Sequence, residues 1–287
     1  MPEHNTLTLS IVIPVYNEER YIKACLEAIS VQSVMPLEVI VVDNNCTDQT
    51  VTIAQQYDFV KVIKEPVQGR TKARNAGFNA AKGDIIGRID ADSIVMPDWA
   101  ERVRQDFNDP SVQGLAGLGM TRVFLGLNFY STFWSRVYLW TVHSLHAVIT
   151  MWGANMAIRR SAWLRVRDYT APDGSRVHED QDLSLVLVGH GGKIIQDNKL
   201  LIKTNGVSYL YWPKFWAYFK KTFAMKKYHD ELGTLDQAES LKLGFWQSLP
   251  GGLLGWSLTS FFIIYSLICW PIITLLRRFK KDFQHIR

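Results

Sequence analysis

Four short apolar runs lie in the first ninety residues of the chain, and each is followed by polar residues. They occupy positions 7–15, 37–42, 60–63 and 85–89 and are rich in Ile, Val and Leu. Runs of this length and composition are typical of buried strands. The pattern therefore predicts four strands in this part of the chain.

The segments between the runs carry the signals of helices. Apolar residues recur at helical spacing after the first run, at Tyr21, Ile22, Cys25, Leu26 and Ile29. Asn17 is a candidate cap for this helix, with Glu18 and Glu19 in its first turn. The Ala-rich segment 69–82 predicts a further helix, which Gly83 would end in a left-handed cap. Strands that alternate with helices predict an α/β fold, with a mostly parallel sheet covered on both faces.

Polar residues stand where three of the predicted strands leave the sheet. The first strand is followed by Tyr16-Asn17-Glu18, the second by Asp43-Asn44 and the fourth by Asp90-Ala91-Asp92. The carboxyl ends of parallel strands are where open α/β sheets bind ligands. We therefore expect the three groups to line one pocket.

The pair Asp90 and Asp92 is the strongest chemical signal in this pocket. Neighbouring carboxylates repel each other, and burial raises the cost of keeping both charged, so a cation stabilises the pair. The interpretation we favour is a divalent metal that carries a diphosphate. The alternative is a solvated turn that caps the helix opened by Pro97.

Charge and cysteine content narrow the class of partner. The net charge is +5, but no basic stripe interleaved with aromatic residues is present, so no nucleic-acid partner is expected. Basic residues flank apolar sequence in the last third, a pattern that favours an anionic lipid surface. The three cysteines are odd in number and lack metal-type spacing, which fits a reducing compartment. No signal-peptide pattern precedes the first strand, so we expect the catalytic region to be cytoplasmic.

Four segments resemble the successive signatures of family 2 glycosyltransferases of the GT-A fold, a Rossmann-like mixed sheet. They are 13–19, 41–48, 73–77 and 83–92, in order and at ordinary spacing. This resemblance implies a nucleoside-diphosphate sugar as donor and Mg²⁺ or Mn²⁺ as cofactor. Asn44-Asn45-Cys46 departs from the usual Asp-Gly-Ser, so the choice between UDP and GDP stays open.

The resemblance also assigns roles to single residues. It implies that Pro14, Tyr16 and Glu18 line the nucleotide pocket and that Asp43 reads the base. It places Arg74 near the nucleotide and Asp90 near the ribose, and it assigns Asp92, with Asp90, to the metal. Arg70, just ahead of the metal strand, could add positive charge for the phosphates.

The second half of the site is expected from two later segments. A strand with room for close approach is predicted over 112–122, which contains three glycines. Segment 152–160 resembles the family's strand beside donor sugar and acceptor, which assigns Trp152, Gly153 and Asn155 to that role.

Segment 177–185 resembles the family's Glu-Asp signature at the start of a helix. Apolar residues recur behind it at helical spacing, which would leave Glu179 and Asp180 at the amino end, facing the cleft. A helix amino terminus helps to keep a carboxylate ionised, as a general base must be. By resemblance, Asp180 is the base in an inverting transfer and Glu179 positions the acceptor or a loop.

Segment 124–158 is aromatic and nearly free of charge, with Arg136 as its one charged residue. A helix at the lipid surface is the interpretation we favour, because Trp and Tyr side chains are at home there. Two alternatives remain: an ordinary buried helix, and a membrane span over 137–158, which is about as long as the ~20 residues that a bilayer needs.

The segment 243–276 carries no charged residue, and a basic tail follows at 277–281. The run exceeds one membrane span but falls short of two, so we expect a re-entrant or shallow hairpin segment. A single span is the competing topology. We therefore divide the chain into a catalytic domain, 1–230, and a membrane-inserted or re-entrant segment, 231–287.

The resemblance as a whole predicts a membrane-associated, metal-dependent, inverting glycosyltransferase that acts on a hydroxyl of a lipid-linked or membrane-proximal glycan. The Gln-x-x-Arg-Trp signature of processive members is missing near 212–228, which favours a single transfer per encounter. One alternative acceptor is the phosphate of a polyprenyl carrier. A non-enzymatic alternative is a membrane-anchored nucleotide-binding module. The oligomeric state is left open.

Overall fold

The computed structural model describes residues 7–122, 130–146, 148–204 and, within 220–231, residues 220, 221, 224, 225, 227–229 and 231. Its elements, in chain order, are β1 (Leu9–Val15), α1 (Ile22–Ser30), β2 (Glu38–Asp43), α2 (Thr50–Ala54), β3 (Val60–Lys64), α3 (Arg70–Ala80), β4 (Ile85–Ile89), β5 (Ile94–Val95), α4 (Trp99–Asp106), β6 (Val112–Arg122), β7 (Tyr130–Ser131), α5 (Phe133–His146), β8 (Asn155–Arg159), α6 (Arg160–Val166), a short 3-10 helix (Arg167–Tyr169), α7 (Glu179–Gly189) and β9 (Lys193–Thr204).

One mixed sheet of nine strands organises the described residues, in the order β3-β2-β1-β4-β8-β6-β9-β5, with β7 paired to β6. The four strands predicted from the apolar runs are all present and pair in parallel. Strand β8 then runs antiparallel to both β4 and β6, which turns the parallel half into a mixed sheet. The predicted α/β fold with a mixed, mostly parallel sheet is confirmed.

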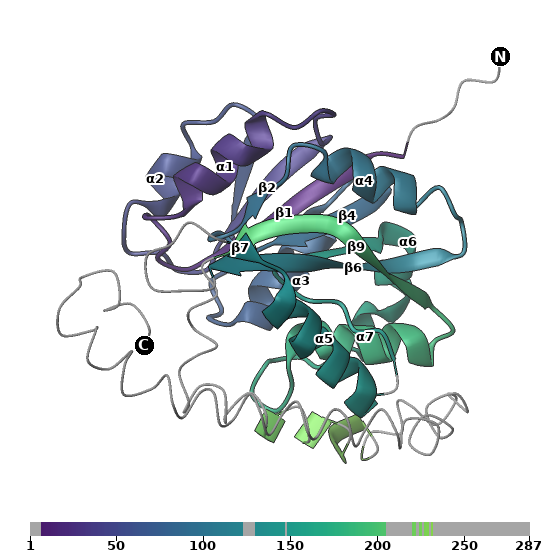
Figure 1. Ribbon diagram of the computed structural model, residues 1–287. Coiled ribbons are helices and arrows are strands. Elements are labelled where there is room, and N and C mark those ends of the chain that lie inside the picture. The colour runs from purple at the N-terminus through teal and green to yellow at the C-terminus, as the bar shows by residue number, and fades with distance from the viewer. Residues whose placement is uncertain are drawn as a thin grey trace, which may run out of the picture.

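Helices cover both faces of this sheet, as Figure 1 shows, with α1, α2 and α4 on one side and α3, α6 and α7 on the other. Side chains of β1 alternate between the two layers: Ile11 and Ile13 pack toward α1 and α4, whereas Val12 packs toward α3. Strands covered on both faces bury both sets of side chains, which is why the runs are continuously apolar. The predicted apolar stripe of α1 is buried as well.

The predicted helix start at Asn17 is wrong. Helix α1 begins at Ile22, and Asn17 takes a left-handed backbone conformation with φ of 57°. Its Oδ1 accepts a hydrogen bond from the backbone N–H of Thr47, at 2.8 Å. The backbone N–H of Glu18 donates to Oγ1 of Thr50, at 2.7 Å. Long-range contacts therefore hold this segment as a loop on the pocket rim, where local capping would have made it helical.

The predicted left-handed cap at Gly83 is also wrong. Helix α3 ends at Ala80, and its C-cap residue Ala81 is extended. Gly83 is required for a different reason, because a Cβ there would lie 2.7 Å from the backbone N of Ser10. Its own N–H donates to the Ser10 hydroxyl, at 2.9 Å. Close approach between the chain and β1 thus explains this glycine.

The prediction of a strand with close approach over 112–122 is confirmed by β6. A Cβ on Gly117 would lie 2.2 Å from Nδ2 of Asn155, and a Cβ on Gly119 would lie 2.4 Å from the Trp152 ring. These glycines leave room for the side chain of Trp152, in the turn before β8, and for that of Asn155, the first residue of the strand. That turn is thereby fixed against the sheet.

The alternative of a membrane span over 137–158 is wrong, because α5 ends at His146 and β8 lies inside the sheet. Within the described residues, no helix has both the length and the apolar character needed to cross a bilayer. The predictions for 231–287, including the uncharged run and the basic tail, fall almost entirely outside the described residues. The structure therefore leaves the proposed division at residue 230 untested.

Candidate active site

The parallel pairing of β1 with β2 and β4 brings the ends of these strands to one edge of the sheet. Pro14 lies inside β1, opposite Val42, and Tyr16 follows that strand with 52% of its surface exposed. Asp43 closes β2, where its Oδ1 accepts the backbone N–H of Cys46, at 2.8 Å. The three polar groups predicted to share a pocket therefore follow adjacent strands.

Asn44 is a buried residue that ties the end of β2 to the loop before α3. Its side chain is 3% exposed and donates to the backbone oxygens of Glu65 and Val67, at 2.9 and 2.8 Å. Its Oδ1 accepts the N–H of Gly69, at 2.8 Å. This residue, which the sequence places among the polar residues after the second strand and which departs from the family pattern, fixes the loop that leads into α3. That loop ends at Arg70, the first residue of the helix.

An acidic group forms where β1 and β4 end. The pKa of Glu18 is raised to about 7, first by burial and then by the negative charges of Asp92 and Asp90. This effect indicates that the three carboxylates lie near one another, although Arg70 offsets part of the repulsion. Hard oxygen donors of this kind suit Mg²⁺ or Mn²⁺.

Among the residues that the structure describes, no three His, Cys, Asp or Glu side chains are arranged to hold a metal by themselves. Mg²⁺ is commonly bound by one or two carboxylates together with substrate phosphates. Asp90 and Asp92 fit that kind of site, in which the protein supplies only part of the ligand shell. A purely protein-made metal cage does not fit.

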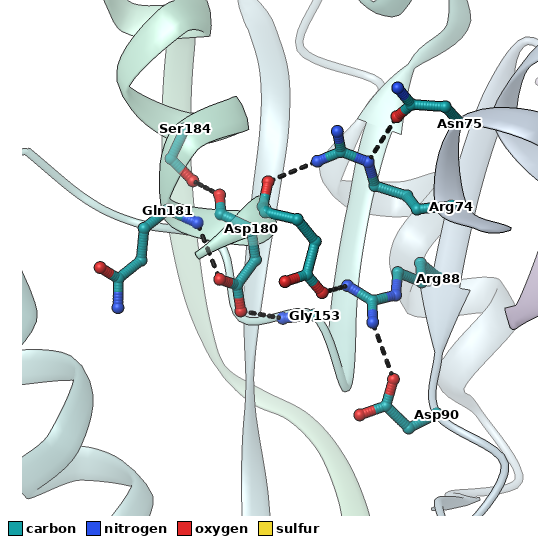
Figure 2. A network of polar contacts seen from close by, with 9 residues as sticks. Arg74, Asn75, Arg88, Asp90, Gly153, Asp180, Gln181 and Ser184 are labelled. Carbon is teal, nitrogen blue, oxygen red and sulfur yellow. Dashed lines mark hydrogen bonds and ion pairs between the residues drawn. The ribbon is translucent and has the colours of Figure 1, made fainter. Parts of the chain in front are cut away.

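Arg88 connects this acidic edge to the opposite side of the site, as Figure 2 shows. Its Nη2 lies 3.0 Å from Oδ1 of Asp90, and its Nη1 lies 2.9 Å from Oε1 of Glu179. The side chain of Arg88 is 4% exposed. The sequence analysis missed this residue, although a lone cation within the apolar run 85–89 was a usable signal, because a buried charge requires partners.

Glu179 and Asp180 begin α7, as predicted, and their surroundings separate their protonation behaviour. Burial opposes the charge on Glu179, but Arg88, Arg70 and Arg74 outweigh it and hold its pKa at about 2. The pKa of Asp180 is raised, first by burial and then by the charge of Glu179. Adjacent carboxyl groups whose pKa values differ in this way are candidates for acid and base roles.

Asp180 is held by backbone donors. Its Oδ2 accepts the N–H of Gly153, at 2.9 Å, and its Oδ1 accepts the N–H of Gln181, at 2.8 Å (Figure 2). The Ser184 hydroxyl donates to the backbone oxygen of Asp180, at 2.7 Å. These contacts fix the direction of the carboxylate, and burial together with the charge of Glu179 outweighs the nearby positive charges, so its pKa stays raised. Asp180 therefore retains the basicity that a proton acceptor needs.

The two arginines predicted near the nucleotide differ in position. Arg74 is fully buried beneath α7, where its Nη1 donates to the backbone oxygen of Glu179 and its Nε donates to Asn75, at 2.9 Å. Arg70 is exposed, and its charge acts on both Glu18 and Glu179. Arg70 thus lies between the two halves of the site, whereas Arg74 supports α7 from below.

The three residues predicted to border the sugars also lie in different places. Gly153 lies in the site, between Asp180 and the guanidinium of Arg88. The side chain of Trp152 is 7% exposed and packs over β6.

Asn155 lies in the interior of the sheet. It is fully buried, accepts from the Trp99 indole at 2.8 Å and donates to two backbone oxygens of neighbouring strands. We therefore replace the predicted sugar contact with a structural role, because the described contacts already engage its amide oxygen and both amide hydrogens.

The first turns of α7 are anchored by helical residues within 220–231, which sequence reasoning did not connect to the site. Nε2 of His229 lies 3.0 Å from Oδ1 of Asp182, and both side chains are fully buried. Met225 packs in the same small cluster, with Ala171, Val177 and Leu185. This contact fixes the helix that carries Asp180.

Comparisons with known proteins identify the family and the fold of the chain. The glycosyl transferase family 2 model matches residues 10–163, more than half of the chain. Glycosyltransferase AglE of Haloferax volcanii is 39% identical over 101 residues, which cover 33% of each chain. Glycosyltransferase GlyG of Streptococcus pneumoniae is 31% identical over 114 residues, which cover 38% of each chain. The aligned part spans about a third of the length of such curated relatives.

Solved structures share the fold at low sequence identity. The Pyrobaculum calidifontis mannosyltransferase PcManGT, in complex with GDP-Man and Mn²⁺, superposes with a TM-score of 0.61 at 17% identity, covering 98% of this chain and 83% of that one. Staphylococcus aureus TarS 1–349 with UDP-GlcNAc gives 0.55 at 20% identity, covering 69% and 58%. At this identity the likeness supports the GT-A fold, and the family follows from the sequence match. The chain belongs to glycosyl transferase family 2.

Proposed function

We propose that this protein is an inverting glycosyltransferase that moves a sugar from a nucleoside diphosphate to an acceptor hydroxyl. The observation that carries the proposal is that Glu179 and Asp180, at the start of α7, have pKa values shifted in opposite directions. Arginines keep Glu179 ionised, whereas burial and the charge of Glu179 raise the pKa of its neighbour Asp180. One carboxyl is thereby held as a fixed charge and the other as a proton acceptor.

The proposed reaction uses Asp180 as the general base. Its carboxylate takes the proton of the acceptor hydroxyl while the hydroxyl oxygen attacks the anomeric carbon. The bond from that carbon to the diphosphate oxygen breaks, and its electron pair leaves with the nucleoside diphosphate. Attack on the face opposite the leaving group inverts the configuration.

The donor side is proposed to lie along the ends of β1, β2 and β4. Pro14, Tyr16 and Glu18 would line the nucleotide pocket, and Asp43 would contact the base. Arg70 would oppose the charge that develops on the diphosphate, because it is exposed beside Glu18 and Glu179. Neighbours in complex with GDP-Man and with UDP-GlcNAc support a nucleotide sugar and leave both bases possible.

A divalent cation fits the donor side. Asp92 and Asp90 would hold Mg²⁺ or Mn²⁺, which would neutralise charge on the leaving diphosphate. The raised pKa of Glu18 supports a local excess of negative charge, and the neighbour in complex with Mn²⁺ supports a divalent metal in this fold.

The decisive experiment is a screen of UDP- and GDP-linked sugars for slow hydrolysis with Mn²⁺ present, which needs no knowledge of the acceptor. One donor should be hydrolysed, and Asp92→Ala should remove that hydrolysis. Tight nucleotide binding by calorimetry without hydrolysis or transfer to any acceptor pool would favour a binding module instead.

The proposed acceptor is a hydroxyl of a lipid-linked or membrane-proximal glycan. A polyprenyl phosphate would attack without a base, so transfer to it would survive Asp180→Asn, whereas transfer to a hydroxyl would be nearly lost. Membrane association with a cytoplasmic catalytic region belongs to the same proposal, supported by the uncharged run 243–276 and the basic tail. Flotation with anionic vesicles, and protease access to the tail in sealed vesicles, would test it.

A further inference from the structure

Arg88 is a buried cation in the middle of a sheet. Its neighbours in β4 are apolar, and its side chain is 4% exposed. A guanidinium in such a place is costly unless it is paired on several sides. It is paired with two carboxylates from different parts of the chain, Asp90 and Glu179, at 3.0 and 2.9 Å. The second partner lies 91 positions away in the sequence.

The guanidinium contacts each carboxylate through a different nitrogen, and it therefore bridges the two. Asp90 belongs to the donor side of the site, and Glu179 precedes the proposed base. The Asp90 side chain is 44% exposed, whereas that of Glu179 is 12% exposed. A change at the open carboxylate can therefore be transmitted to the enclosed one through a single rigid group.

Gly153 completes the unit. A Cβ at this position would lie 2.1 Å from Nη1 and 2.8 Å from Cζ of Arg88, so only glycine lets the guanidinium occupy its place. The N–H of the same glycine donates to Asp180. The guanidinium is thus packed against the backbone that orients the base, as well as paired with the residue before it.

We infer that Arg88 is a positioning residue that couples the donor side of the site to the base helix, so that occupation at Asp90 and the placement of Glu179-Asp180 depend on each other. This inference rests on the proposed function. Linkage requires the coupling to be reciprocal: a change at Glu179 must alter nucleotide affinity through Arg88. A guanidinium that only neutralises buried charge would give no such dependence.

A double-mutant cycle tests the coupling by binding, without turnover. The dissociation constants of UDP and of GDP with Mn²⁺ are measured by calorimetry for the unaltered protein, Glu179→Gln, Arg88→Lys and the double variant. Lysine keeps one positive charge but cannot span two carboxylates. The effect of Glu179→Gln on affinity should differ by about threefold or more between the two backgrounds.

Any influence of Arg70, which also lies near Glu179, is present in both backgrounds and cancels in the cycle. Equal effects in the two backgrounds would overturn the inference. Failure of the unaltered protein to bind either nucleotide would reject the proposed function, and the inference would fall with it.

Arg102 provides the matched control. It is a partly buried arginine of α4 that pairs with Asp197 of β9, at 3.0 Å, outside the site. Arg102→Lys should leave both the affinity and the effect of Glu179→Gln unchanged. In transfer assays, Arg88→Lys should lower kcat by about tenfold to a hundredfold, because small displacements of a base are costly, whereas Arg102→Lys should not.

A second measurement avoids any change at Arg88. Asp90→Asn, Glu179→Gln and their double variant are unfolded in denaturant without nucleotide or metal. If one guanidinium serves both carboxylates, the losses of stability should not add. Additive losses would contradict the inference even if Arg88→Lys failed to fold.

Discussion

The two halves of the site are built differently. On the proposed donor side, the carboxylates stand on turns after strands and remain partly open, as the 44% exposure of the Asp90 side chain illustrates. On the proposed acceptor side, Glu179 and Asp180 are enclosed at the start of a helix. Burial acts on both, Arg88, Arg70 and Arg74 lower the pKa of Glu179, and the charge of Glu179 raises the pKa of Asp180. Ligand can supply what the open half lacks, whereas the enclosed half must be complete before substrate arrives.

The largest expected effect tests the enclosed half. Asp180→Asn removes the proton acceptor while keeping its size, so transfer to a hydroxyl should fall by about 10²–10⁴-fold. Nucleotide affinity measured by calorimetry should change little. Asp168→Asn, at a side chain that is 84% exposed, is the matched control and should transfer normally. Retention of most of the transfer by Asp180→Asn would remove this residue from the base role.

The next effect tests the open half. Asp92→Ala should weaken Mn²⁺-dependent nucleotide binding by about a hundredfold, because the cation loses a charged ligand. Chelation of metal from the unaltered protein should produce a similar loss. Added Mn²⁺ should then restore binding to the unaltered protein and not to the variant. Equal restoration of both would place the metal elsewhere.

A third prediction concerns Asn155, which the sequence analysis assigned to the sugars and which the structure places in the core. Asn155→Ala would leave the Trp99 indole and two backbone oxygens without their buried partner, and should lower the free energy of unfolding by about 2–4 kcal/mol. Donor affinity of the folded variant should be unchanged. Asn79→Ala, which removes a surface contact to the Trp163 indole, should cost less. A loss of sugar affinity without a loss of stability would restore the sugar-binding role.

The smallest expected effect is on pH dependence. Asp180 accepts a proton only when it is ionised, so kcat at saturating donor should fall as the pH drops below its pKa. Burial and Glu179 raise that pKa above its ordinary value of 3.8. The acidic limb should therefore be centred above 3.8 and should stay in place in Asp168→Asn. A rate that remains flat through that range would argue against a carboxylate base.

The open half could be predicted from the sequence because its signals are local. Strands end where apolar runs stop, and Asp43, Asp90 and Asp92 follow those ends directly. Helix α7 was predicted for the same reason, since the acids of its first turn and the apolar residues behind them lie close together in the sequence. Family resemblance then supplied roles that local pattern alone leaves ambiguous.

The enclosed half depends on contacts that no local pattern records. Arg88 pairs with Glu179, which lies far along the chain. Asn155 fits into the core because the glycines of β6 leave room for it. The open half contains one such case as well: Asn17 would cap a helix in isolation, but its bond to Thr47 keeps it in a loop. In each case tertiary contacts override a reasonable local preference.

Strand parity gives Arg88 its direction. It lies on the same face of β4 as Ile86, which packs toward α3 and α7, whereas Ile85 and Ile89 face α1 and α4. A single residue inserted between positions 86 and 88 would preserve an apolar strand yet turn the guanidinium into the opposite layer, among side chains with no carboxylate to meet it. A change in the length of β4 is therefore expected to damage the site more than most substitutions within the strand.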